Sequence, residues 1–249
     1  MDKLEGVIKF KDVNFSYTKD KQVLYDFNLQ VKAGQKVALV GSTGSGKTTV
    51  VNLLMRFYDV DSGEILIDDV NIKEIDCATL RKNTAIVLQD TVLFADTIKN
   101  NLKYSNEAAT DEQMYAAAVM SNCDTMINKM PLKYDTELMA EGENISQGQR
   151  QLLSIARAFL AQPKILILDE ATSNVDTRTE KHIQDAMLKL MENRTSLIIA
   201  HRLSTIQDAD IIVVMDEGHI VEAGNHKELL NKMGRYYKLY MTQFAGQTI

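Results

Sequence analysis

One short stretch, GSTGSGKTT at 41–49, constrains the fold more than any other part of the sequence. It follows the apolar run KVALV and precedes the helical pattern TTVVNLLMRFY, which is the strand, loop and helix order of a phosphate-binding loop. Glycines let the backbone curl so that successive N–H groups face one ligand, and the helix start adds partial positive charge. The stretch therefore predicts that the chain binds a nucleoside triphosphate.

Two side chains of this loop have distinct expected tasks. We expect Lys47 to neutralise the outer phosphates and the Thr48 hydroxyl to supply a hard oxygen for Mg²⁺. The expected ligand-binding residues of the loop are Ser42, Thr43, Gly44, Ser45, Gly46, Lys47, Thr48 and Thr49.

The apolar runs around the loop predict an α/β fold. Short runs bounded by turn residues alternate with helical patterns, which indicates a buried parallel sheet. Residues 7–17 and 24–34 instead alternate polar and apolar residues, which is typical of half-exposed antiparallel strands. The expected buried strands are KVALV at 36–40, TAIVL at 84–88, ILIL at 165–168, SLIIA at 196–200 and DIIVVM at 210–215.

Between Asp90 and Gln162 the strand pattern gives way to helical periodicity, which predicts an inserted helical subdomain. The expected boundaries are 1–89 and 163–249 for the β subdomain and a RecA-like P-loop core, with 90–162 as the helical subdomain. Helical spacing from 177 to 193 places its methionines in the core. A hairpin is expected at 215–224, turned at Glu217 and Gly218.

An acidic pair ends the run ILIL, in the order ILILDE. Carboxylates at the carboxyl edge of a buried strand face the ligand crevice of an open α/β sheet. We expect Asp169 to hold Mg²⁺, and Glu170 to position and polarise the water that attacks the γ-phosphate.

Composition excludes several other classes of protein. The formal net charge is −6 and basic residues do not cluster, so nucleic acid is not an expected partner. Cys77 and Cys123 lie in no CxxC or Cys/His cluster, which argues against a disulfide framework or a zinc site. No apolar run approaches the roughly 20 residues of a membrane span, so we expect a soluble chain whose membrane-spanning part, if any, lies elsewhere.

The ordered motifs together resemble the nucleotide-binding domain of ABC transporters. The phosphate loop, the helical insertion, the stretch ISQGQ at 145–149 and ILILDEATS occur in that family's order, and the resemblance covers Val7 to Phe244 as one domain, 7–244. It implies an ATPase in which two domains pair head to tail, with each signature loop facing the partner's γ-phosphate. The residues expected to act in trans are Ser146, Gln147, Gly148, Gln149 and Asp176.

The resemblance also implies roles for isolated residues. Tyr17 corresponds to the aromatic residue that stacks on adenine. Gln89 corresponds to the Q-loop glutamine, which contacts Mg²⁺ and the water, and His201 corresponds to the switch histidine at the γ-phosphate. The implied catalytic set is thus Glu170, His201 and Gln89, the metal set is Thr48, Gln89 and Asp169, and the cofactors are ATP and Mg²⁺.

The sequence around the insertion resembles the exporter branch of the family. TVLFADTIKNNL at 91–102 and YDTELMAEGEN at 134–144 are similar to segments that receive a cytoplasmic helix of the transmembrane domain. This implies a domain at the cytoplasmic face of the cell membrane that powers export. The expected partners are the transmembrane domains of an exporter and a second nucleotide-binding domain.

The signature departs from the family's LSGGQ at two positions. Ile145 replaces leucine conservatively, whereas Gln147 places a side chain where backbone has to approach a phosphate closely. The departure resembles one half of a heterodimeric multidrug exporter, so a non-identical second domain is expected. Two alternatives stay open: a soluble ABC-type ATPase, and a regulatory half that hydrolyses ATP slowly.

Overall fold

The computed structural model describes residues 4–88, 91–169, 175–200 and 203–243. These residues form two compact units, with 1–84, 164–170 and 193–249 assigned to the first and 85–163 and 171–192 to the second. The second unit groups residues 171–192 with the helical insertion. The subdomain boundaries expected from the sequence stay a prediction.

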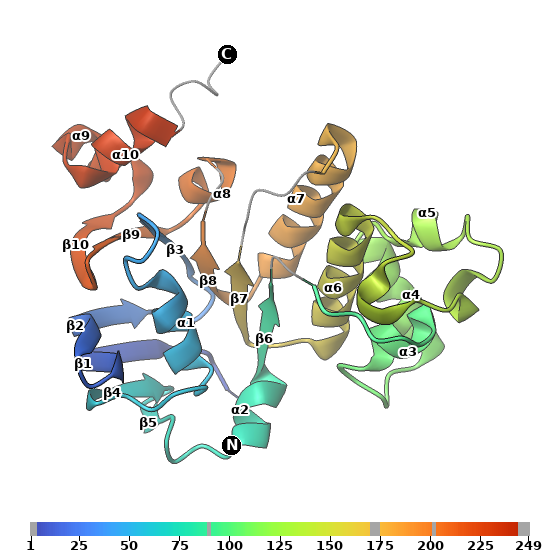
Figure 1. Ribbon diagram of the computed structural model, residues 1–249, viewed down its shortest axis with the longest axis horizontal. Helices are drawn as coiled ribbons and strands as arrows, with labels where there is room; N and C mark the ends of the chain where they lie inside the picture. The colour runs from blue at the N-terminus through green and yellow to red at the C-terminus, as the bar shows by residue number, and fades with distance from the viewer. Residues whose placement is uncertain (1–3, 89–90, 170–174, 201–202, 244–249) are drawn as a thin grey trace. The chain divides into compact units, whose positions relative to one another are not determined.

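An antiparallel sheet in the first unit has the strand order β2-β1-β4-β5 (Figure 1). Phe10 lies opposite Leu29 on one side and Ile65 on the other, and its ring meets that of Phe27 edge to face at 5.3 Å. Alternate residues are buried, as the polar and apolar alternation predicts. The strands are β1 (Ile8–Thr18), β2 (Lys21–Val31), β4 (Ser62–Ile67) and β5 (Val70–Asn71).

The central sheet of the first unit has the order β10-β9-β3-β8-β7. The pairs β9-β3, β3-β8 and β8-β7 are parallel, and Leu39 at the centre lies between Ile199 and Val213. Its strands are β3 (Lys36–Gly41), β7 (Ile165–Asp169), β8 (Thr195–Ile199), β9 (Ile211–Asp216) and β10 (His219–Gly224). The buried parallel strands expected from KVALV, ILIL, SLIIA and DIIVVM are confirmed.

The predicted hairpin joins β9 to β10, which pair antiparallel. Its two turn residues, Glu217 and Gly218, have φ values of 45° and 82°, so both adopt the left-handed conformation that a tight hairpin turn needs. The helices of this unit are α1 (Lys47–Leu54), α2 (Cys77–Asn83), α8 (Leu203–Gln207), α9 (His226–Lys232) and α10 (Arg235–Gln243).

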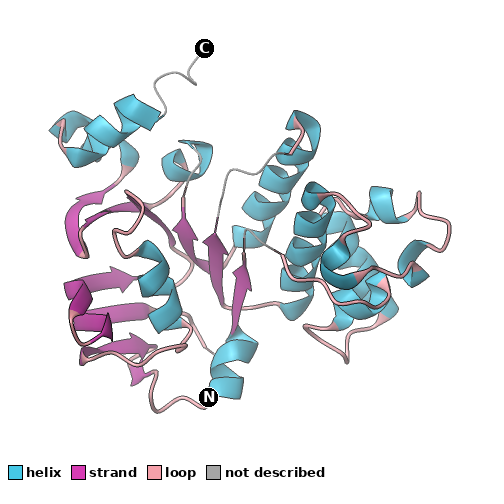
Figure 2. Cartoon of the chain, viewed as in Figure 1, coloured by secondary structure: helices cyan, strands magenta, loops and turns pink. Residues whose placement is uncertain are grey.

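Helices and loops make up most of the second unit (Figure 2). The helix α6 (Gln147–Ala161) packs against α3, α4 and α7, and its C-cap Gln162 has a left-handed conformation just before Pro163. On α7 the methionines Met187 and Met191 are buried, as the helical spacing predicts. The other elements are α3 (Ile98–Lys103), α4 (Asp111–Met120), α5 (Asp124–Ile127), η1 (Lys133–Asp135), η2 (Ala140–Gly142) and α7 (Thr177–Met191).

The strand β6 (Thr84–Val87) starts at the last residue of the first unit and continues into the second. It ends one residue earlier than the apolar run TAIVL suggested. No helix within the described ranges is long and apolar enough to cross a membrane.

Candidate nucleotide-binding site

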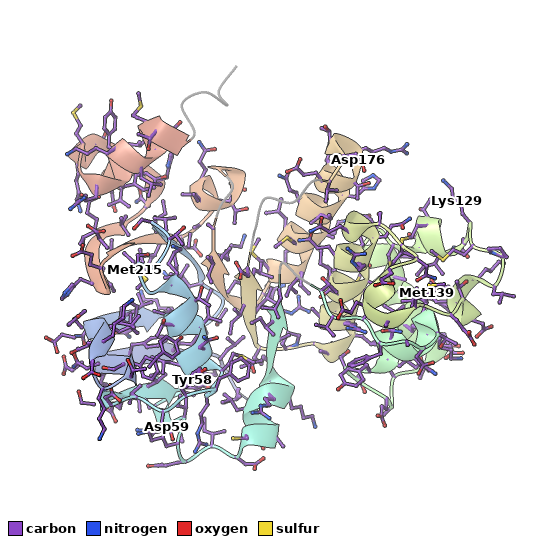
Figure 3. All side chains as sticks on the ribbon, in the orientation of Figure 1. Tyr58, Asp59, Lys129, Met139, Asp176 and Met215 are labelled. Carbon is purple, nitrogen blue, oxygen red and sulfur yellow. The ribbon has the colours of Figure 1, made fainter. Side chains whose placement is uncertain are left out.

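The phosphate loop has the backbone that the sequence predicts. β3 ends at Gly41 and α1 begins at Lys47, with Gly46 as its N-cap at a φ of 103°. A Cβ at Gly41 would lie 2.2 Å from the carbonyl oxygen of Met215 on β9, the strand beside it (Figure 3). Glycine at 41 is therefore required by the close approach of two backbones, and glycine at 46 by its left-handed conformation.

Lys47 lies inside the loop, where its side chain is 7% exposed. Its Nζ donates to the carbonyl oxygens of Gly41 at 2.9 Å and Ser42 at 2.8 Å, and to Ser45 Oγ at 3.3 Å. Burial lowers the pKa of the Lys47 ammonium, and the Asp169 carboxylate opposes this shift. The loop therefore holds a partly desolvated positive charge, which suits an incoming phosphate.

The hydroxyls of the loop differ in access. Those of Ser42, Thr43 and Thr48 belong to exposed residues, whereas Ser45 and Thr49 are buried. The Thr49 hydroxyl lies 3.2 Å from the Tyr17 hydroxyl, and so it helps to hold that ring. Thr48 is therefore the better placed of the two threonines to offer its oxygen to a cation.

Tyr17 belongs to an aromatic cluster at the end of β1. Its ring meets those of Phe15 at 4.8 Å and Tyr58 at 5.0 Å, in both cases edge to face, and it is 45% exposed. Asn52 of α1 donates to its hydroxyl at 3.1 Å. These contacts fix an accessible ring next to the loop, which suits a flat base.

Sequence reasoning missed Tyr58 and Asn52 as supports of this ring. Tyr58 follows α1 and is 47% exposed, so it adds a second aromatic surface to the cluster (Figure 3). The only sequence signal was an aromatic pair, Phe57 and Tyr58, soon after the loop helix.

Asp169 is the last residue of β7, paired with Ile199 of β8. It lies at the carboxyl end of a strand in the same parallel sheet whose β3 leads into the phosphate loop, and its charge acts on Lys47. The expected catalytic residues Gln89, Glu170 and His201 lie outside the described residues.

The predicted signature stretch begins the helix α6. Ser146 is its N-cap: Ser146 Oγ accepts from the Gln149 backbone N–H at 3.3 Å, and Gln149 Oε1 accepts from the Ser146 N–H at 2.9 Å. This reciprocal capping box fixes the helix start. Ser146 is exposed, and Gln147 and Gln149 are half-buried.

Gly148 has a packing role that sequence reasoning did not foresee. A Cβ there would lie 2.5 Å from Thr179 Cγ2 and 2.9 Å from Val175 Cγ1. The start of α6 and the start of α7 thus approach each other where only a glycine fits.

Asp176 is exposed and caps α7 (Figure 3). It accepts from the Thr179 backbone N–H at 3.0 Å, and this hydrogen bond lowers the pKa of the Asp176 carboxyl. The structure therefore brings together all five residues expected to act in trans, 146–149 and Asp176, at two adjacent helix starts of the second unit.

The geometry defines a P-loop nucleotide-binding protein: a glycine loop between a parallel strand and a helix, a buried lysine within it, and a carboxylate at the end of a strand in the same sheet. The described residues contain no group of three or more histidine, cysteine, aspartate or glutamate side chains that could hold a metal ion. The oxygens of Thr48 and Asp169 are hard ligands that fit Mg²⁺, which binds proteins through few side chains and through phosphates.

Comparisons with known proteins agree with this class. The family model for the ABC transporter matches residues 24–173. An uncharacterised ABC transporter ATP-binding protein of Bacillus subtilis is 54% identical over 239 residues, which are 96% of this chain and 40% of that protein. The chain therefore belongs to the ABC transporter family, as an ATP-binding domain.

Two other relatives are named as ATP-binding/permease proteins. A putative multidrug export ATP-binding/permease protein of Staphylococcus aureus is 49% identical, with 96% of this chain and 42% of that protein covered. A fatty acid ABC transporter ATP-binding/permease protein of Mycobacterium bovis is 51% identical, over 95% of this chain and 37% of that protein.

Among solved structures, a bacterial Atm1-family ABC exporter with ATP bound matches with a TM-score of 0.90 and 41% identity, covering 96% of this chain and 42% of that one. The chain thus spans about two fifths of the length of these relatives. The mixed α/β fold expected from the sequence is confirmed by this match.

Proposed function

We propose that this chain is an ATP-hydrolysing domain that powers export across a membrane. The observation that carries the proposal is the phosphate loop, in which backbone carbonyl oxygens hold Lys47 inside the glycine turn. The Asp169 carboxylate acts electrostatically on the Lys47 ammonium. The exporter-type relatives support transport as the purpose of ATP use.

The proposed site on one chain has a binding part and a catalytic part. Lys47 binds the outer phosphates and the Tyr17 ring stacks on the base. Thr48, Asp169 and Gln89 hold Mg²⁺, which when bound neutralises phosphate charge. Glu170 accepts a proton from the attacking water, and His201 orients Glu170.

The site is completed by a second domain. In the proposed head-to-tail dimer, Ser146, Gly148 and Asp176 of one chain close over the ATP of the other. The two adjacent helix starts support this role, because exposed helix N-termini favour phosphate. Gln147 adds a side chain at the same place, so the proposed second domain is a non-identical one with its own signature.

Exposed apolar residues support a proposed surface for the membrane partner. Val92, Phe94 and Tyr104, which we call the docking surface, are 61%, 41% and 63% exposed. Apolar side chains that gather on a surface favour a protein partner. We assign this surface to a cytoplasmic helix of the transmembrane domains, which places the chain at the cytoplasmic face of the cell membrane.

The direct test is turnover by the Glu170→Gln variant. We expect ATP binding to be retained and phosphate release to fall by about 100-fold or more, the usual contribution of a general base. The matched control is Glu192→Gln, which changes an exposed carboxylate that follows α7. Unchanged turnover in Glu170→Gln would remove Glu170 from the proposed role.

One observation favours a second candidate function, a regulatory half with slow hydrolysis: the half-buried Gln147 at the first position of α6. Single-turnover measurements on the chain with its partner domain separate the two candidates. Rapid turnover at the site built on this chain's phosphate loop supports the motor, and turnover only at the partner's loop supports regulation.

A further inference from the structure

One arginine of α6, Arg157, contacts all three residues of the docking surface. Arg157 Nε donates to the Asn101 carbonyl oxygen at 2.6 Å, and Arg157 Nη1 donates to the Val92 carbonyl oxygen at 2.6 Å. Arg157 Nη2 donates to Asn101 Oδ1. All three nitrogens of the guanidinium are thus engaged with the loop after β6 and with α3.

The same guanidinium supports the two exposed rings. Its Cζ lies 5.4 Å from the centre of the Phe94 ring and 5.9 Å from that of Tyr104, and the two ring centres are 4.5 Å apart. A planar guanidinium attracts aromatic faces at such distances. Arg157 therefore links both aromatic residues of the docking surface to α6.

Asn101 completes this attachment. It is 1% exposed, and its side chain binds the loop through Phe94: Oδ1 accepts from the Phe94 N–H at 2.9 Å and Nδ2 donates to the Phe94 carbonyl oxygen at 3.0 Å. Nδ2 also donates to the carbonyl oxygens of Asp96 and Thr97. The loop is consequently fixed to Asn101, and Asn101 is fixed to Arg157.

Pairing with a carboxylate does not explain why an arginine lies at position 157. Arg157 forms no ion pair with a carboxylate in the part of the chain that the structure describes, and its partners are carbonyl oxygens and rings. Burial lowers the pKa of its guanidinium to about 10. The guanidinium is partly removed from water and has no counter-ion among the described residues. We therefore explain Arg157 by its geometry, because only the forked guanidinium of arginine reaches these carbonyl oxygens and rings together.

We propose that Arg157 is a positioning residue that makes the docking surface move with α6. The helix is a rigid rod from its N-cap Ser146 to Arg157, about 16 Å along its axis. A displacement of the α6 start by ATP then reaches Phe94 and Tyr104 through the guanidinium. This inference rests on the proposed function, in which ATP acts on Ser146 and a membrane helix contacts the rings.

A tryptophan probe tests the link in a mixture of this chain with its partner domain, because ATP reaches Ser146 only in the proposed head-to-tail pair. The sequence contains no tryptophan, so Tyr104→Trp introduces a single one on the docking surface. In that mixture we expect ATP to change the tryptophan emission of the Tyr104→Trp chain. Adding Arg157→Gln should reduce that change by about five-fold, in the range of measured couplings between sites, while the ATP concentration for half-saturation stays the same.

Two further variants complete the design. Arg157→Lys keeps the charge and loses the fork, so we expect it to lose most of the signal as well. Arg81→Gln alters an exposed arginine of α2 and should leave the signal intact. Should Arg157→Gln not fold, as judged by circular dichroism, Arg157→Lys decides the question alone.

The outcomes separate the two proposals. A full ATP-dependent signal in Arg157→Gln or Arg157→Lys overturns the positioning role. A parent Tyr104→Trp chain that, mixed with its partner domain, hydrolyses ATP without any signal also overturns it. A parent chain that neither binds nor hydrolyses ATP contradicts the proposed function instead.

Discussion

At the scale of single residues, the buried lysine of the phosphate loop decides whether the site works. The Lys47 ammonium exchanges water for two carbonyl oxygens and one hydroxyl, and the Asp169 carboxylate opposes the lowering of its pKa by burial. The same contacts that position the ammonium also fix the loop before a ligand arrives. Pre-organisation of this kind lowers the entropy cost of binding.

Replacing Lys47 by alanine should weaken ATP binding by about ten-fold or more, since a charge-assisted contact to phosphate contributes roughly 1.5–3 kcal/mol. Isothermal titration with ATP measures the effect. The control is Lys32→Ala, which removes an exposed lysine in the same unit. Equal affinities of the two variants would contradict the role of Lys47.

The two cysteines differ in burial. Burial raises the pKa of the Cys123 thiol to about 12, whereas Cys77 is only half-buried. Because the thiolate is the reactive form, Cys123 should stay protonated and inert up to strongly alkaline pH. We expect a thiol reagent at pH 8 to label Cys77 alone in the folded chain and both cysteines after denaturation. Labelling of Cys123 in the native chain, located by mass spectrometry, would contradict this.

At the scale of elements, α6 and α7 pack so closely at their starts that only a glycine fits at position 148. Gly148 leaves room for Thr179 and Val175, so the two helix starts lie against each other. The resemblance implies that Gly148 lies near a phosphate of the partner domain. The packing of α6 on α7 requires a glycine at this position within one chain as well.

The variant Gly148→Ala should therefore destabilise the chain by about 1–3 kcal/mol, the usual cost of overpacking. Thr179→Ser removes the methyl group nearest to the new Cβ and keeps the hydroxyl, so the double variant should recover part of the loss. Urea unfolding of the single and double variants measures this coupling. Additive effects would show that Thr179 is not the obstacle.

At the scale of the whole molecule, ligand binding should appear as stability. At an ATP concentration of about 100 times Kd, binding adds roughly 2.7 kcal/mol, which for a chain of this size raises Tm by about 5–10 °C. Scanning fluorimetry with and without MgATP tests this, and Lys47→Ala serves as the control with a reduced shift. An equal shift in both proteins would place the nucleotide elsewhere.

Most of the fold could be predicted from the sequence, because the buried strands and the loop glycines leave strong local signals. The strand runs and the turn at Glu217 and Gly218 were predicted correctly. Contacts between residues distant in the sequence left no such signal. Examples are the ring contact between Tyr17 and Tyr58 and the hydrogen bond from Arg157 to Asn101. No periodicity records such pairs.

The seating of Gly148 against Thr179 has a practical consequence for selective inhibition. A compound that pushed these two helix starts apart would disturb Ser146 and Asp176 together, without competing with abundant cellular nucleotide for the glycine loop. It would also meet Gln147, a side chain absent from relatives that carry glycine there. A selective inhibitor of one such domain would then be directed at this helix junction and not at the phosphate loop.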